Sequence, residues 1–241
     1  MTHWITANWP APANIHGVTT LRAGGVSLGQ FSSLNPADHV QDNLQHVLAN
    51  RQRIRKILDL PAEPVWLSQT HSVQVVCADL VTDCPEADAS YSVKKNIVCC
   101  VLTADCLPVL LCDRHGTMIA AIHGGWRGLL NGIIENTLHK MPAGEIMAWL
   151  GPAIGVQCFE VGDDVRSAFI NKSVQFVQAF KKQNNGQYLA DIYHIARILL
   201  NNAGVKEIYG GDYCTVTDIE RFFSYRRDGQ TGRMATLIWM T

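Results

Sequence analysis

Apolar positions along the chain predict a series of buried strands. Six short segments have the composition of strands: residues 65–67, 73–76, 97–102, 108–111, 118–122 and 146–150. The third, fourth and fifth of these are apolar at nearly every position, as expected for central strands that are covered on both faces. The middle of the chain is therefore expected to form the core of a β-sheet.

A second periodicity, with apolar residues three or four positions apart, predicts helices. Four helices are expected, at residues 42–58, 129–139, 163–170 and 192–203. Asp42 offers an N-cap for the first helix, and Pro61 prevents its continuation. Gly204 is placed to close the last helix.

Both ends of the chain predict strands joined to turns. Residues 18–34 contain the glycine-rich run 22–27 and predict a strand followed by a turn. Residues 222–225 and 234–239 flank a polar segment with two glycines and predict a hairpin. Strands and helices are interspersed without strict alternation, and no repeat or linker divides the chain. We expect a single α/β (α+β-like) domain over residues 1–241, with mixed β-sheets layered with helices.

Composition and charge limit the classes of partner. The chain is 47% apolar and 17% charged, which is typical of a globular protein. It has 20 Lys plus Arg against 21 Asp plus Glu. No basic field is therefore available to attract nucleic acid or anionic lipid, and we expect neither as a partner.

The sequence also predicts a cytoplasmic, reducing location. The first six residues have no basic stretch followed by an apolar one, so they do not resemble an export signal. The apolar segments around residues 98–112 are too short and too interrupted to span a membrane. The eight cysteines contain no C-x-x-C pair and are therefore expected to be thiols, mostly in the core.

His71, Cys106 and His123 each lie at the end of a predicted strand and form a candidate metal site. Imidazole and thiolate are ligands of Zn²⁺, and a catalytic zinc site keeps three protein ligands and one open position. Two other interpretations stay open on the residues alone. The three side chains could pack without a ligand, or a histidine could activate Cys106 as a nucleophile.

Several long motifs, in the same order, resemble the laccase-domain polyphenol oxidase family of the YfiH type. The motifs occupy residues 22–27, 33–35, 66–71, 102–111, 120–128, 149–155 and 223–228. Together they cover nearly the whole chain. Members of that family are regarded as purine nucleoside phosphorylases, so the resemblance implies a small-molecule enzyme.

The resemblance implies that His71, Cys106 and His123 are the metal ligands, with Zn²⁺ as the expected metal and Cu²⁺ as one that the same set would bind. The implied reaction is phosphorolysis of adenosine or inosine to the base and ribose 1-phosphate. Adenosine deamination and methylthioadenosine phosphorolysis are the implied companion activities. The expected ligands are a purine nucleoside and phosphate, and both a monomer and a homodimer remain open.

Further polar residues in the motifs are candidates for substrate contacts. Arg22 and Arg226 are expected to bind phosphate through their guanidinium forks, with Tyr225 beside them on the substrate. Asn35 and Gln69 are expected to hydrogen bond to base or ribose. Two catalytic roles are considered for Asp105, which precedes Cys106 in an apolar segment: orienting a ligand histidine, or accepting a proton. His39 lies close to Asn35 and is the next histidine to consider.

Three rival functions remain open from the sequence. A copper-dependent phenol oxidase would normally need more histidines than this site offers. A cysteine hydrolase that edits a peptidoglycan precursor would form a covalent intermediate on Cys106 without a metal. A structural zinc site in a binding module would need a fourth ligand, for which we find no convincing candidate.

Overall fold

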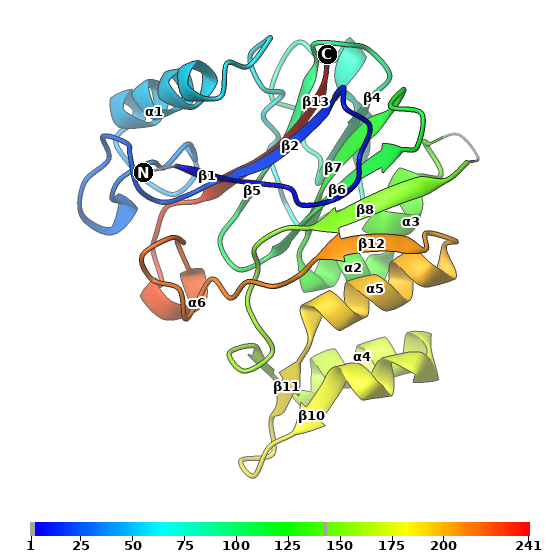
Figure 1. Cartoon of the computed structure of the whole chain (residues 1–241). Coiled ribbons are helices and arrows are strands. Elements are labelled where there is room, and N and C mark those ends of the chain that lie inside the picture. Colours follow the sequence, from blue (N-terminus) through cyan, green and yellow to red (C-terminus); the bar gives the residue numbers. More distant parts are fainter. Residues whose placement is uncertain (1–2, 142–143) are drawn as a thin grey trace.

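Two β-sheets pack face to face in the computed structural model, which describes residues 3–141 and 144–241 (Figure 1). Met1 and Thr2, the start of the segment considered as an export signal, and two residues of the expected domain, 142 and 143, lie outside the described residues. The first sheet is antiparallel and has the order β1-β2-β13-β5. Its strands are β1 (Trp4–Thr6), β2 (Ile15–Thr20), β13 (Met234–Met240) and β5 (Val98–Thr103).

The second sheet is mixed and has the order β12-β8-β6-β7-β4-β3. Its strands are β12 (Glu207–Gly210), β8 (Ile146–Leu150), β6 (Leu107–Asp113), β7 (Ile119–Gly124), β4 (Ala89–Ser92) and β3 (Val75–Cys77). The β12–β8 and β3–β4 pairs are parallel, and the other pairs are antiparallel. Leu110, Ile119 and Trp149 of this sheet pack against Ile238 of the first, so a core lies between the two sheets.

Helices cover the outer faces of both sheets. Helix α1 (Leu44–Ile57) packs against the first sheet through Ile54, because β13 presents alternate residues such as Leu237 to that side. Helices α2 (Trp126–Asn131), α3 (Ile133–Leu138) and α5 (Ile192–Asn202) cover the second sheet with one apolar cluster. The predicted fold class is confirmed: this is a mixed α/β structure of helix, sheet, sheet and helix layers.

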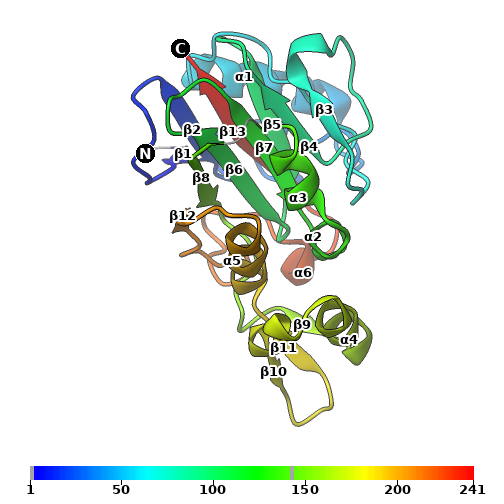
Figure 2. The same cartoon turned by 90° about the vertical axis from the view of Figure 1, so that its right-hand side faces the viewer.

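A smaller unit extends from the layers beside α5 (Figure 2). It contains α4 (Asp163–Lys172) and the antiparallel sheet β10-β11-β9, formed by Phe180–Lys182, Tyr188–Ala190 and Glu160–Val161. The remaining short helices are η1 (Gly29–Phe31), η2 (Ala78–Leu80), η3 (Val174–Ala179) and α6 (Tyr225–Asp228). Val161 and Phe169 join the apolar cluster under the second sheet, which fixes this unit to the layers.

The helix boundaries differ from the predictions in two places. The N-cap of α1 is Asn43, not Asp42, because the Asn43 side chain accepts the N–H of Gln45. The expected helix over residues 129–139 is two helices, and the first begins at Trp126. Gly132 separates them with a φ of 103°, a left-handed conformation that suits glycine.

The predicted C-terminal hairpin is wrong. Residues 222–225 form no strand, and β13 pairs with β2 and β5 instead. Phe222 and Phe223 are fully buried against Met234, and Ser224 caps α6 by accepting the N–H of Arg227. Residues 65–67 likewise contribute only one bridge, between Val65 and Cys99. Strands β1, β4 and β9 to β12 were not predicted.

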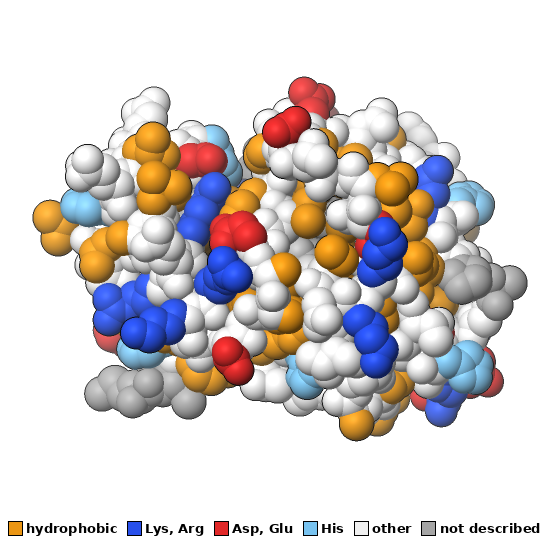
Figure 3. Space-filling model, turned by 90° about the horizontal axis from the view of Figure 1, so that it is seen from above, with side chains coloured by type: hydrophobic (Ala, Val, Ile, Leu, Met, Phe, Trp, Pro, Cys, Tyr) orange, Lys and Arg blue, Asp and Glu red, His pale blue; other side chains and the backbone are white. Residues whose placement is uncertain are grey.

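Two surface properties bear on the expected partners: the distribution of charge and the apolarity of the helices. Basic, acidic and apolar side chains are interspersed on the face shown in Figure 3, so the coloured side chains form no continuous basic patch there. In residues 3–141 and 144–241, no helix has the length and apolarity needed to cross a membrane.

Candidate functional site

The structure brings His71, Cys106 and His123 together, as the sequence predicts. One ligand atom from each residue lies within 4.8 Å of the others. His71 lies in the loop before β3, Cys106 precedes β6 and His123 belongs to β7. Cys106 Sγ lies 3.7 Å from His71 Nε2, and the two imidazole rings meet edge to face at 4.8 Å between centroids.

The register of β6 and β7 explains how Cys106 meets His123. These strands are antiparallel, and Pro108 lies opposite His123. Cys106, just before β6, therefore lies beside the end of β7, although 17 residues separate the two ligands. Gly125 makes room for the third ligand: a Cβ on it would lie 2.6 Å from Cδ2 of His71 and 3.4 Å from Sγ of Cys106.

Asp88 holds both histidines, and sequence reasoning missed it. Its buried carboxylate accepts a hydrogen bond from Nδ1 of His123, with 2.7 Å between Nδ1 and Oδ1. It also accepts the backbone N–H groups of Thr70, His71 and Ser72, at 3.2, 3.1 and 2.6 Å. The bond to Nδ1 leaves Nε2 of His123 available as a metal ligand, an arrangement that is common around protein metals. A carboxylate between two alanines, Ala87-Asp88-Ala89, was the available signal for a buried acid.

The electrostatics of the site favour the thiolate form of Cys106. Burial raises the pKa of its thiol, but the charge of His123 and hydrogen bonds from both histidines outweigh burial and lower the pKa to about 6. Burial lowers the pKa of His123, but the charge of Cys106 and the bond to Asp88 raise it to about 9. Burial raises the pKa of Asp88 as well, yet hydrogen bonds from His123 and Ser72 bring it below its usual value.

These donors fit the metal that the resemblance implies. Two imidazoles and one thiolate form a borderline-soft set that suits Zn²⁺ and also binds copper ions. His71 is exposed and Cys106 is partly exposed, so a fourth position would face the adjoining cavity. Among the described residues, this is the one group of three or more such side chains close enough to hold a metal.

The cavity beside these ligands has a volume of about 500 Å³. Its wall combines apolar, aromatic and basic side chains, which is typical of a small-molecule site. The residues that line it are His39, Gln69, His71, Leu102, Thr103, Ala104, Asp105, Cys106, His123, Trp126, Arg127, Ile154, Phe159, Ile192, Tyr225, Arg226 and Arg233. His39, Arg127 and Arg233 were not among the predicted site residues.

Arg226 and Tyr225 lie at the cavity, as predicted for substrate contacts. Nη1 of Arg226 donates to the carbonyls of Cys158 and Glu160 at 3.0 and 3.2 Å, which fixes the position of its guanidinium group. Tyr225 is 61% exposed, and the Arg233 guanidinium lies over its ring at 6.0 Å. Phosphate-binding by Arg226 and substrate contact by Tyr225 therefore remain compatible with the geometry.

Gln69 and Asp105 line the cavity but use their polar groups within the protein. Gln69 forms two hydrogen bonds with the backbone of Leu102. Asp105, at a φ of 85°, accepts the hydroxyls of Thr215 and Ser224 and the N–H of Arg226, at 2.6, 3.1 and 2.6 Å. Both its oxygens are engaged, so Asp105 holds loops together; of the two roles considered for it, the contact with a ligand histidine is made by Asp88.

Arg22 and Asn35 are not brought to the cavity. The Arg22 guanidinium donates to the carbonyls of Ser32 and Ile219 and lies over the ring of Phe223. Asn35 is fully buried and bonds to Asp42 and Ala37. Its Oδ1 also accepts the N–H of Arg233 at 3.0 Å, so it supports a cavity residue without contacting the cavity.

The chain is similar to proteins that are named for one activity. It is 48% identical over 246 residues to the purine nucleoside phosphorylase YfiH of Escherichia coli (strain K12), with all of both chains covered. It is 46% identical over 243 residues to a purine nucleoside phosphorylase of Pseudomonas aeruginosa, covering 100% of this chain and 99% of that one.

Solved structures show the same fold. The Neisseria meningitidis protein NMB0706 superposes with a TM-score of 0.96 at 48% identity, with 99% of each chain covered. YlmD from Geobacillus stearothermophilus superposes with a TM-score of 0.90 at 29% identity, covering 99% of this chain and 96% of that one. Residues 16–241 match the protein family described as multi-copper polyphenol oxidoreductase laccase. The chain therefore belongs to the family described as multi-copper polyphenol oxidoreductase laccase, in its YfiH-type branch.

Proposed function

We propose that this protein is a cytoplasmic, zinc-dependent purine nucleoside phosphorylase. The observation that carries the proposal is the position of the His71, Cys106 and His123 ligands in the wall of a cavity that also presents Arg127, Arg226 and Arg233. The relatives named as purine nucleoside phosphorylases match the chain over its whole length. Adenosine deamination and methylthioadenosine phosphorolysis belong to the proposal as companion activities.

The cavity offers aromatic surfaces for a nucleoside and guanidinium groups for phosphate. Trp126, Phe159 and Tyr225 are aromatic side chains in its wall, and a planar purine suits such surfaces. Arginine forks suit the paired oxygens of phosphate. The backbone carbonyls of Thr231 and Gly232 accept Nη1 of Arg233 at 2.8 and 3.0 Å, so this cation is already oriented before a substrate binds.

Positioning and charge stabilisation would provide most of the catalysis by the chain's own residues. Phosphate carries negative charge into the cavity, and the charges of Arg226 and Arg233 would hold it against the nucleoside. Burial and the charge of Arg233 lower the pKa of His39. A neutral His39 can accept a hydrogen bond or a proton from the substrate. A bound Zn²⁺ would supply Lewis acidity beside the substrate.

The test is turnover of nucleosides by purified protein of known metal content. Adenosine and inosine are supplied with and without phosphate, and free base, ribose 1-phosphate and inosine are measured. The proposal predicts phosphate-dependent release of base. Release of inosine from adenosine would support the deaminase activity, and absence of base release at full zinc occupancy would contradict the phosphorylase.

A cysteine hydrolase is the second candidate, and one observation favours it. The low pKa of Cys106 beside two histidines also describes an activated nucleophile. That function predicts an acyl adduct on Cys106 and activity after chelation. A copper-dependent phenol oxidase has less support, because the described residues offer one three-ligand group for metal.

A further inference from the structure

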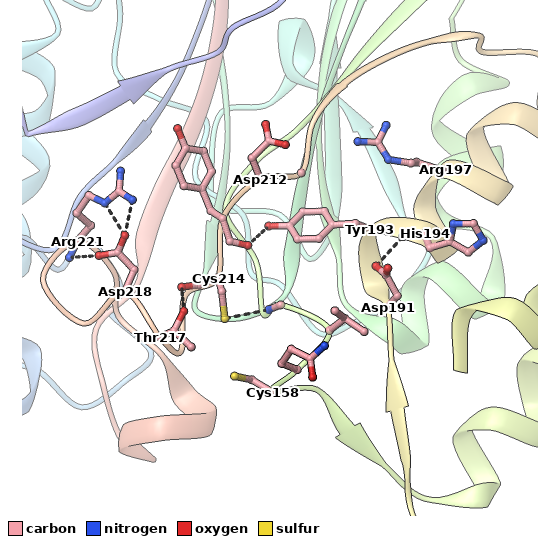
Figure 4. A pocket seen from close by; sticks show the side chains of 15 residues that line it. Cys158, Asp191, Tyr193, His194, Arg197, Asp212, Cys214, Thr217, Asp218 and Arg221 are labelled. Atoms are coloured by element: carbon pink, nitrogen blue, oxygen red, sulfur yellow. Dashed lines mark hydrogen bonds and ion pairs between the residues drawn. The ribbon is translucent and has the colours of Figure 1, made fainter. Parts of the chain in front are cut away.

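A second cavity, of about 650 Å³, is lined by residues 155–158 (Figure 4), and the residues on either side of them, Ile154 and Phe159, line the candidate site. Cys158, on this loop, and Cys214, on the segment after β12, both line it. Both side chains are partly exposed free thiols. Nothing in the proposed reaction uses this cavity or these two cysteines.

A backbone N–H group donates to the sulfur of Cys214. The N–H of Gly155 donates to Sγ at 3.3 Å, as Figure 4 shows. Burial raises the pKa of the Cys214 thiol, but the polar groups of Thr217, Gly155 and Val216 around it outweigh burial and lower it. Donors of this kind stabilise a thiolate, which is the nucleophilic form of cysteine.

Cys158 supplies a second thiol close to the first. Gly155, whose N–H bonds to Sγ of Cys214, also accepts the backbone N–H of Cys158 at 2.9 Å, and both sulfurs lie at the edge of the same cavity in Figure 4. Burial and the charge of Cys214 raise the pKa of Cys158. The pair is therefore asymmetric: one sulfur favours the thiolate, and its neighbour keeps its proton.

Four other cysteines outside the metal site lack this arrangement. Cys99, Cys100 and Cys112 are buried, and burial raises the pKa of each thiol. Cys84 is exposed overall, yet partial burial still raises the pKa of its thiol. An exposed thiol with a raised pKa makes Cys84 a matched reference for Cys214.

We propose that Cys214 and Cys158 form a redox-active pair in which a hydroperoxide oxidises Cys214 and Cys158 then closes a disulfide. The Cys214 thiolate attacks one peroxide oxygen, the O–O bond breaks, and the sulfur becomes a sulfenic acid while the released alkoxide or hydroxide takes up a proton. The Cys158 sulfur then attacks the Cys214 sulfur, and the sulfenic oxygen leaves as water with the proton from Cys158. Two thiols are oxidised, and one peroxide is reduced.

The disulfide would change the wall of the substrate cavity. The carbonyl of Cys158 accepts Nη1 of Arg226, and Phe159 beside it lines that cavity. Next to Cys214, the Thr215 hydroxyl donates to Asp105. Joining the two sulfurs would pull on both contacts. Oxidation is therefore expected to lower nucleoside turnover, a consequence that rests on the proposed function.

The test maps the cysteines of the zinc-loaded protein after hydrogen peroxide treatment. Free thiols are alkylated and the protein is digested without reductant. The proposal predicts a peptide linked through Cys158 and Cys214 that dithiothreitol separates. In Cys158→Ser, dimedone should label Cys214 as sulfenic acid, and in Cys214→Ser, Cys158 should stay reduced. Without peroxide, iodoacetamide should label Cys214 at least about tenfold faster than Cys84.

Two results would overturn the pair. One is wild-type protein in which Cys158 and Cys214 both remain alkylatable after peroxide, and the other is a Cys214 that reacts no faster than Cys84. Cys84→Ser is the control and should form the linked peptide normally. The mapping needs no turnover, so failure of the pair and failure of the proposed phosphorylase are separate results. If base release occurs, reversible loss of it on oxidation, absent from Cys158→Ser, is the expected regulatory effect.

Discussion

Asp88 accepts a hydrogen bond from Nδ1 of His123 at 2.7 Å, and both side chains are buried. The same carboxylate also accepts hydrogen bonds from the backbone N–H groups of His71 and of the residues on either side of it. One acid therefore fixes two of the three expected ligands, from β7 and from the loop before β3. This relation explains how residues far apart in the chain keep a common geometry before any metal binds.

Replacing Asp88 with Asn should weaken zinc binding by roughly 10- to 100-fold, the usual cost of losing such a partner. An amide is uncharged and presents a donor on one side, so it cannot satisfy all four N–H groups. Zinc affinity is measured by competition with a chromogenic chelator. Glu86→Gln, at an exposed position two residues earlier, is the control and should bind zinc as the wild type does. Equal affinities for Asp88→Asn and wild type would exclude this role.

Gly125→Ala should displace His71 and lower zinc occupancy. The added Cβ would lie 2.6 Å from Cδ2 of His71, which is closer than real contacts allow. Gly128→Ala, in the helix that Gly125 precedes, adds a Cβ whose nearest neighbours are at 3.3 Å or more, and it should keep its zinc. The zinc content of both purified variants is measured. Full zinc occupancy in Gly125→Ala would show that the close approach of the backbone at residue 125 to the His71 ring is not needed for zinc binding.

Sequence patterns located the candidate metal ligands but not the residue that orients them. Strand ends were readable from apolar segments, so convergence of Cys106 and His123 followed from two neighbouring strands and the family motifs. Asp88 escaped because a carboxylate near the start of a short, partly polar strand has no periodic signature. Its burial depends on tertiary contacts with residues 70–72, which no local pattern encodes.

The family motifs mixed residues that face the cavity with residues that support it. Arg22 and Asn35 lie in motifs, yet their side chains hold loops through backbone and buried polar contacts. The predicted hairpin failed for a related reason. Phe222 and Phe223 are apolar enough for a strand, but they fill a pocket around Met234, and the following Ser224 starts a helix.

Asp113 should stabilise the turn that sets the register of β6 and β7. Burial raises its pKa, but the hydroxyl and N–H of Thr117 and the N–H of Met118 outweigh burial and lower it. A depressed folded-state pKa gives stability that is present above the ordinary value of 3.8 and is lost as pH falls through the folded-state value. Asp113→Asn should therefore cost about 1–3 kcal/mol at neutral pH.

Urea unfolding of Asp113→Asn and wild type, repeated at several pH values, measures this difference. The gap should be constant at neutral pH and narrow as pH falls below 3.8. Asp83→Asn, at an exposed position, should leave the free energy of unfolding unchanged. A gap for Asp113→Asn that stayed the same down to strongly acid pH would contradict the electrostatic explanation.

Arg233→Met should raise KM for phosphate by roughly 10- to 100-fold, because it removes a charge-assisted contact to the anion. Its guanidinium is oriented by two carbonyls at the cavity wall. Initial rates over a range of phosphate concentrations, at saturating inosine, give this constant. Arg53→Met, on the exposed side of α1, is the matched control. An unchanged KM for phosphate in Arg233→Met would place the anion elsewhere.

The central claim is that His71, Cys106 and His123 hold a zinc ion that phosphorolysis of purine nucleosides requires. The most direct measurement compares wild type with Cys106→Ala for zinc content and for release of base from inosine, with and without phosphate. We predict near-stoichiometric zinc and phosphate-dependent release in the wild type, and loss of both in the variant. Undiminished phosphate-dependent release by zinc-free Cys106→Ala would contradict the claim.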